Sequence, residues 1–166
     1  MMYSTKNNGR ADINNAIEKK TWFPIIRRDN RIYCEILDYL GKCCDPDIWT
    51  IRLTHELIGE SARELPRSVQ KLFEQYRIRT EISWRYKDHY TIITSTDICH
   101  CTPEAIDLLK SYENFFAIED KLDVAFYEGE TCLLRTVNHE QKLNLNLVFF
   151  QNLTSIIESE KHLPKR

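Results

Sequence analysis

Residues 80–96, TEISWRYKDHYTIITST, decide the fold class of this chain. Apolar and polar side chains alternate on both sides of a polar turn at Lys87–Asp88, which is the pattern of two strands joined by a tight connection. The first strand places Ile82, Trp84 and Tyr86 on one face, and the second strand groups Tyr90, Ile92 and Thr94. The stretch therefore predicts an antiparallel β-hairpin.

The C-terminal part of the chain predicts more strands. Residues 121–137, KLDVAFYEGETCLLRTV, carry two apolar stretches around Gly129, a residue that accepts the backbone angles of a tight turn, so they predict a second hairpin. Residues 142–150, KLNLNLVFF, alternate leucine with polar residues and predict a half-buried strand. Residues 152–160, NLTSIIESE, predict a closing helix.

Helices are expected earlier in the chain. Residues 31–40, RIYCEILDYL, space their apolar side chains by three and four and predict an amphipathic helix. Residues 48–64 predict a strand that turns helical near Thr54. Pro66 suits the first turn of a further helix, whose apolar stripe comprises Leu65, Val69, Leu72, Phe73 and Tyr76.

Residues 96–107, TDICHCTPEAID, carry a helix start signal. Thr102 suits the N-cap, Pro103 the first helical position and Glu104 the first turn. A helix should therefore begin within a residue or two of Thr102, and residues 98–101, ICHC, should connect a strand to that helix. The helical stripe comprises Ala105, Leu108, Leu109, Tyr112, Phe115 and Phe116.

These elements predict an α+β fold, with N-terminal helices followed by a largely antiparallel sheet of hairpins and interspersed helices. A chain of 166 residues is long enough for one substantial core and short for two, so residues 1–166 are expected to form a single domain. Residues 1–10 and 162–166 are polar and without apolar periodicity, and we expect them to be loosely ordered.

Composition indicates a cytoplasmic protein without membrane contact. No stretch approaches the roughly 20 apolar residues that span a bilayer, and no apolar segment follows the N-terminal charges. The six cysteines include the adjacent pair Cys43–Cys44 and the close pair Cys99 and Cys101, which do not form a disulfide framework. We therefore expect reduced thiols.

The cysteines and histidines raise the question of metal or thiol chemistry. Structural zinc usually takes C-x₂-C spacing twice over, and the spacing here differs from it. A nucleophilic Cys99 with His139 or His55 as base could be drawn, but no phosphate-binding, dinucleotide, hydrolase or zinc-protease motif occurs. We expect no enzyme activity, no cofactor and no metal. The possible soft ligands are Cys43, Cys44, Cys99, His100, Cys101 and Cys132.

A winged helix-turn-helix over residues 54–95 is the alternative interpretation. The expected order of helices followed by a basic hairpin resembles that DNA-binding motif, and Gln70 could reach a base edge. Glu64 and Glu74 interrupt the basic face, however, and the net charge of the chain is −2. The candidate phosphate contacts are Arg67, Lys71, Arg77, Arg79, Arg85 and Lys87.

The charges are unevenly distributed along the chain. Residues 63–87 hold seven Lys and Arg against three Asp and Glu, whereas residues 97–130 hold two against nine. An acidic surface attracts a basic partner and speeds association. The candidate partner-binding residues are seven carboxylates and two aromatic anchors: Asp107, Tyr112, Glu113, Glu119, Asp120, Asp123, Tyr127, Glu128 and Glu130.

Residues 123–140, DVAFYEGETCLLRTVNHE, resemble the small cytoplasmic immunity proteins that bacteria encode beside polymorphic toxins, including those of contact-dependent growth inhibition. The resemblance implies a protein without catalysis of its own that binds a toxin domain, often a basic nuclease, and covers its active or substrate-binding surface. It carries over no individual site residue. The expected partner is therefore a protein toxin domain, and the oligomeric state is left open.

Overall fold

The computed structural model describes residues 22–25, 30–58, 68–119, 121–146 and 148–150. Seven strands form one antiparallel sheet in the order β1-β7-β6-β5-β2-β4-β3. The strands are β1 (Trp22–Ile25), β2 (Trp49–Ile58), β3 (Arg77–Lys87), β4 (Tyr90–His100), β5 (Leu122–Glu128), β6 (Thr131–Val137) and β7 (Lys142–Asn146). The expected α+β class is confirmed.

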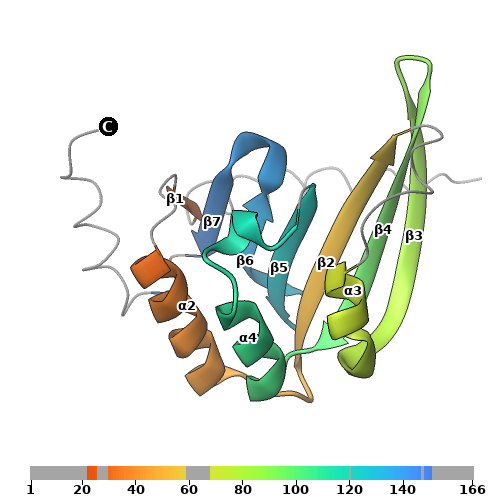
Figure 1. Cartoon of the computed structure of the whole chain (residues 1–166). Coiled ribbons are helices and arrows are strands. Elements are labelled where there is room, and N and C mark those ends of the chain that lie inside the picture. Colours follow the sequence, from red (N-terminus) through yellow and green to blue (C-terminus); the bar gives the residue numbers. More distant parts are fainter. Residues whose placement is uncertain (1–21, 26–29, 59–67, 120, 147, 151–166) are drawn as a thin grey trace, which may run out of the picture.

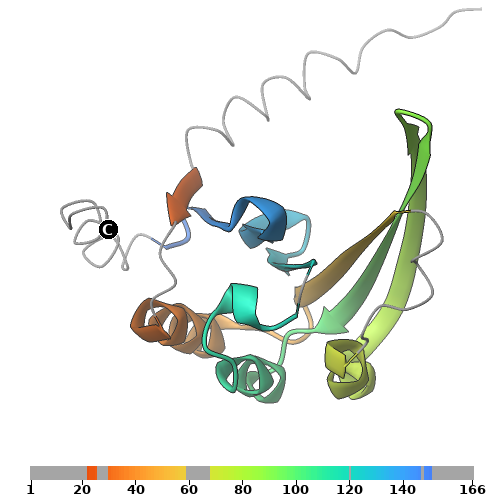
Figure 2. The ribbon, with the colours of Figure 1, turned by 45° about the horizontal axis from the view of Figure 1, so that its top comes forward.

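The helices lie along one face of this sheet (Figures 1 and 2). They are α2 (Asn30–Cys43), α3 (Ser68–Leu72) and α4 (Pro103–Lys110), with short 3₁₀ turns η2 (Glu74–Tyr76), η3 (Phe115–Ala117) and η4 (Asn138–Glu140). Strand residues Ile51, Leu53 and Phe126 are fully buried beneath the helices. The helices contribute buried residues to the same core, namely Leu37 and Leu40 of α2 and Ile106 and Leu109 of α4.

The start of α4 confirms the predicted cap. Thr102 has extended backbone angles, and its hydroxyl accepts a hydrogen bond from the Ala105 N–H at 3.1 Å. Pro103 opens the helix as expected. The ICHC stretch lies outside the helix, although Ile98, Cys99 and His100 are the last residues of β4.

Three of the expected helical segments differ from the prediction. The helical turn near Thr54 is wrong, because β2 continues to Ile58 as an inner strand that pairs with β4 and β5 on its two sides. The helix expected from Pro66 is short where it is described, from Ser68 to Leu72. The α4 helix ends at Lys110, and the Asn114 side chain then caps η3 by accepting from two backbone N–H groups.

Both predicted hairpins are confirmed, and the strand expected over 142–150 is confirmed as β7 from Lys142 to Asn146, with a turn at residues 148–150. Gly129 takes a positive φ of 56° in the turn between β5 and β6, as its position required. The closing helix at 152–160 and the loose ends at 1–10 and 162–166 lie outside the described residues.

Candidate functional site

Strand β3 occupies one edge of the sheet, and all eleven of its residues are exposed. Among the described residues, only β4 pairs with it. The β3–β4 turn consists of Asp88 and His89, both with positive φ (49° and 68°), as in the two-residue turns that join hairpin strands. Lys87 and Tyr90 flank this turn and form a hydrogen-bonded pair in such hairpins. Because pairs alternate, the backbone groups on the open side of β3 belong to Ile82, Trp84 and Tyr86.

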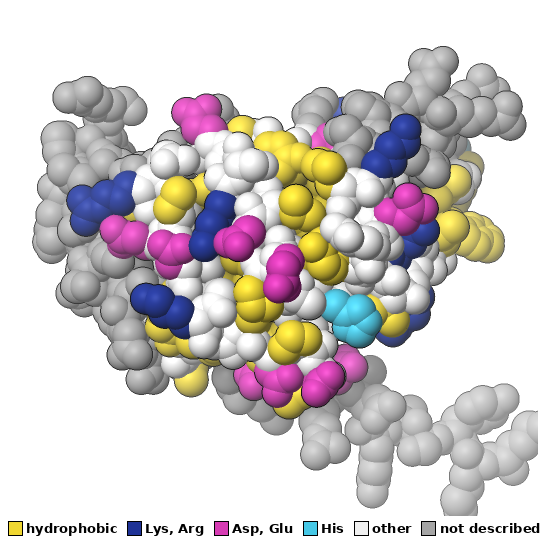
Figure 3. Space-filling model, turned by 60° about the horizontal axis from the view of Figure 1, so that its bottom comes forward, with side chains coloured by type: hydrophobic (Ala, Val, Ile, Leu, Met, Phe, Trp, Pro, Cys, Tyr) yellow, Lys and Arg dark blue, Asp and Glu magenta, His cyan; other side chains and the backbone are white. Residues whose placement is uncertain are grey.

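The same three residues form an exposed apolar stripe on the helix-bearing face of the sheet. Exposure is 69% for Ile82, 77% for Trp84 and 69% for Tyr86. Figure 3 shows hydrophobic side chains protruding at the edge of the molecule where β3 lies. Six of the eight large exposed hydrophobic residues in the described part lie on α3, β3 or β4: Leu72, Ile78, Ile82, Trp84, Tyr86 and Tyr90. Exposed apolar residues that lie together, as Ile82, Trp84 and Tyr86 do, are candidates for an interaction surface, whereas scattered single residues are not.

The short α3 helix explains why the stripe is open. Val69 and Phe73 are buried and anchor α3 and the turn after it to the core. In Figure 1, α3 lies beside the lower half of the hairpin, while the tip of β3 and β4 extends well beyond it. The described helices therefore leave the distal part of β3 uncovered.

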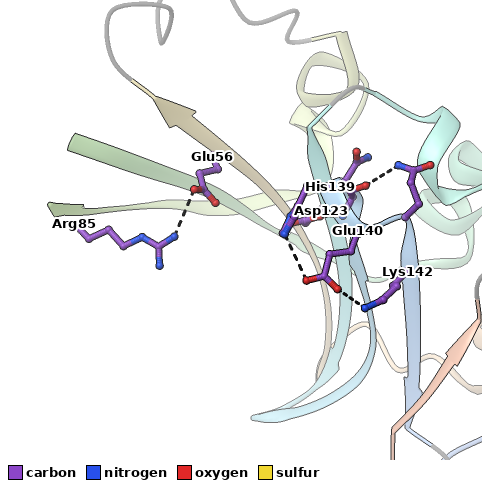
Figure 4. Close-up of polar contacts among 8 residues, drawn as sticks. Glu56, Arg85, Asp123, His139, Glu140 and Lys142 are labelled. Atoms are coloured by element: carbon purple, nitrogen blue, oxygen red, sulfur yellow. Dashed lines mark hydrogen bonds and ion pairs between the residues drawn. The ribbon is translucent and has the colours of Figure 1, made fainter. Parts of the chain in front are cut away.

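The opposite face of β3 is charged. Arg79 pairs with Glu81 at 2.9 Å, and Arg85 reaches over β4 to Glu56 of β2 at 3.5 Å (Figure 4). Exposed pairs of this kind contribute little to stability, on the order of 0 to 1 kcal/mol, so a partner can compete for these charges. The strand thus offers a partner an open backbone edge, an apolar face and a charged face.

The predicted acidic residues do not form one surface. Glu128 and Glu130 lie at the β5–β6 turn, where the Gly129 N–H donates to the Ile48 carbonyl at 3.1 Å. Glu113 lies near the start of α2, since its carbonyl accepts from the Asn30 amide at 2.8 Å. Asp107 pairs with Lys110 at 3.1 Å on the exposed side of α4. Asp120 lies outside the described residues.

The acidic turn has neighbours that sequence reasoning missed. The loop before β2 brings exposed Asp45 and Asp47 to the same end of the sheet as Glu128 and Glu130. Glu104 lies near the same loop, since burial and, to a smaller degree, the negative charge of Glu104 raise the pKa of the Cys44 thiol. These carboxylates are far apart in sequence, and only the strand pairing brings them together.

Glu119 was expected to be exposed to solvent, and this expectation is wrong, because its side chain is only 5% exposed. Its Oε2 lies 3.6 Å from Nε2 of His55, whose side chain is 3% exposed. The other ring nitrogen of His55 lies 3.3 Å from the Gln70 amide. Gln70, the residue considered above for contact with a DNA base, therefore contacts the core histidine. Within the described part of the chain, both Glu119 carboxylate oxygens and His55 Nε2 lack a hydrogen-bond partner.

The two aromatic anchors are half-buried. The Arg52 guanidinium carbon lies 3.8 Å from the centre of the Tyr127 ring, so a cation–π contact occupies one face of that ring. Burial raises the pKa of both Tyr112 and Tyr127. Neither side chain protrudes as Trp84 does.

Asp123 is tied to the protein itself. Its Oδ1 accepts the Asn138 backbone N–H at 2.6 Å, which fixes the start of η4 beside the pair formed by Glu140 and Lys142 (Figure 4). Burial raises the pKa of Asp123 above its ordinary value, and the hydrogen bond from Asn138 opposes part of that shift.

Asp123→Asn should therefore leave the protein at least as stable as wild type at pH 7. A carboxyl group whose pKa is raised by folding stabilises the folded protein at pH values below its ordinary pKa. This stabilisation is lost as the pH rises through the pKa of the folded state. Asparagine keeps the acceptor oxygen and removes the half-buried charge. Urea unfolding at pH 7 and near pH 4 checks this, and any advantage of the variant should shrink at the lower pH. A clear loss of stability at pH 7 would contradict it.

Two of the thiols, Cys99 and Cys101, are in surroundings that disfavour the reactive thiolate form. Cys99 and Cys101 are fully buried, and burial, with a smaller effect of the Asp97 charge, raises the pKa of Cys99 to about 12. Burial also raises the pKa of Cys101. His100 is exposed, and its Nδ1 lies 3.4 Å from the Pro46 carbonyl. Within the described ranges none of the six cysteines forms a disulfide bond, and no three His, Cys, Asp or Glu residues gather as metal ligands would.

Comparison with family models, curated proteins and solved structures finds no match for this chain. Among the helices that the structure describes, none is sufficiently long and apolar to span a membrane.

Proposed function

We propose that this chain is a non-catalytic binding protein that captures a partner protein along β3. The observation that carries the proposal is the open edge strand, with Ile82, Trp84 and Tyr86 exposed along one face. An edge strand presents unpaired N–H and C=O groups that another strand can pair with. Adding a strand in this way supplies affinity through the backbone and specificity through alternate side chains.

The side chains of β3 indicate what the partner strand presents. Four basic residues against Glu81 favour a partner with an acidic segment, and exposed aromatic residues supply the anchors typical of protein interfaces. We therefore propose that the basic residues of β3 contact the partner, in place of the acidic residues predicted from the sequence. The basic residues are Arg77, Arg79, Arg85 and Lys87.

The physiological role that we propose is neutralisation of a toxin domain in the cytoplasm, by covering its active or substrate-binding surface. The resemblance of residues 123–140 to immunity proteins supports this role, and a large exposed protein-binding edge is compatible with it. The acidic end at Glu128 and Glu130 can still steer a basic toxin during the encounter.

The test is to express the chain with the protein encoded by the adjacent gene. We expect that protein to arrest growth alone, the chain to restore growth, and the purified pair to form a stable complex. Loss of growth arrest without complex formation would contradict capture. A neighbour that is harmless and does not bind would remove the toxin assignment.

DNA binding is the second candidate function, because Arg79, Arg85 and Lys87 lie on one face of a long hairpin, as on the wing of a winged helix. The helix that this motif needs near Thr54 is replaced by β2 as far as Ile58. A duplex DNA titration at two salt concentrations separates the functions. Tight binding that falls steeply with salt would favour DNA over a protein partner.

A further inference from the structure

We propose that β3 of one chain pairs antiparallel with β3 of a second copy. The twofold axis of this pair passes between the two copies of Trp84, so that Trp84 lies opposite its own copy (an axis through Trp84). This inference rests on the proposed function, since the self-paired form would cover the capture strand until a partner displaces it. The two copies would join their sheets edge to edge, with the pairing over residues 81–87. The toxin complex and the dimer would then exclude each other.

The geometry of β3 permits this pairing. When two copies of β3 pair antiparallel around a twofold axis, their helix-bearing faces lie on the same side of the joined sheet only if the axis is perpendicular to that sheet. In that arrangement even-numbered residues of β3 lie opposite even-numbered residues. The open backbone groups belong to Ile82, Trp84 and Tyr86, so these residues would form the hydrogen-bonded pairs between copies.

The charges of β3 select the register. An axis through Glu81 or Arg85 would place that residue opposite its own copy, and an axis through Ile82 would place Arg79 opposite Arg85. An axis through Ser83 would place Arg79 opposite Lys87. Like charges directly opposite are destabilising. An axis through Trp84 instead places each Glu81 opposite Lys87 of the other copy, with no like-charge pair over residues 81–87.

The apolar stripe agrees with the same register. Ile82 would lie opposite Tyr86 on either side of a central Trp84 pair, so the two stripes would join into one. Aromatic and β-branched pairs across strands are stabilising. A long exposed edge strand is also a hazard for open-ended aggregation, and a closed twofold pair removes that edge.

A charge exchange tests the register directly. Sedimentation equilibrium should show a dimer for the wild type, and Glu81→Lys or Lys87→Glu should each raise its dissociation constant by about tenfold, because each creates two like-charge pairs. The double variant E81K/K87E should restore dimerisation. Both positions are exposed, so thermal unfolding should confirm that every variant is folded.

Glu128→Lys is the matched control, since it makes the same charge change at an exposed residue on another part of the sheet. It should leave the dimer unchanged. A wild type that is monomeric up to about 100 μM, a dimer insensitive to both single changes, or a double variant that fails to recover would each overturn the inference. A monomer that still captures the toxin would leave the proposed function intact, whereas a dimer that captures no partner would count against that function alone.

Discussion

Trp84→Ala is expected to weaken capture of the partner protein by about 30-fold or more, which corresponds to about 2 kcal/mol. Trp84 is 77% exposed at the middle of the open strand, so a partner strand would cover it first. Tryptophan at the centre of an interface is among the residues whose truncation costs most. The fold should be unaffected, because the side chain contributes little to the core.

Tyr90→Ala provides the matched control for this prediction. Tyr90 is an aromatic residue of the same hairpin, 62% exposed, but it lies on β4 and on the opposite face of the sheet. Binding kinetics with the chain immobilised at low density, so that self-pairing does not compete, should show a large change for Trp84→Ala and little for Tyr90→Ala. Equal affinities for wild type and Trp84→Ala would place the interface elsewhere.

Local signals in the sequence predicted the hairpins and the α4 start. Alternation over 80–96 and the Thr102–Pro103 pair each depend on neighbouring residues, so no knowledge of the tertiary structure was needed. The end of β2 could not be predicted in the same way. Residues 54–58, THELI, suit a helix as well as a strand, and pairing with distant β4 and β5 decides between them.

The candidate site depended even more on distant contacts. The alternation of Ile82, Trp84 and Tyr86 is the same for an edge strand as for a half-buried inner strand, and the edge position of β3 together with the short α3 helix exposes these residues. Charge counting grouped Glu119 with exposed acids, although folding places it against His55 in the core. The sequence therefore predicted most strands of the sheet, whereas the exposure of Trp84 and the burial of Glu119 follow from the tertiary structure.

The buried His55–Glu119 pair carries the largest predicted effect on stability. Its two side chains are 3% and 5% exposed, so His55→Leu would leave the Glu119 carboxylate buried without its histidine neighbour. Breaking a buried pair by removing one partner typically costs about 3–5 kcal/mol. We expect the free energy of unfolding in urea to fall by about that amount.

The double variant H55L/E119L separates the contribution of the pair from that of packing. Buried pairs replaced by apolar residues of similar volume are often as stable as the original, so the double variant should recover most of the loss. His139 and Glu140 provide the control, because they approach to the same 3.6 Å while the histidine is 78% exposed. His139→Leu should cause no measurable change in unfolding. If His55→Leu also left the free energy of unfolding unchanged, another group or water would have to stabilise the Glu119 carboxylate. The pair would then not stabilise the α3 side of the core.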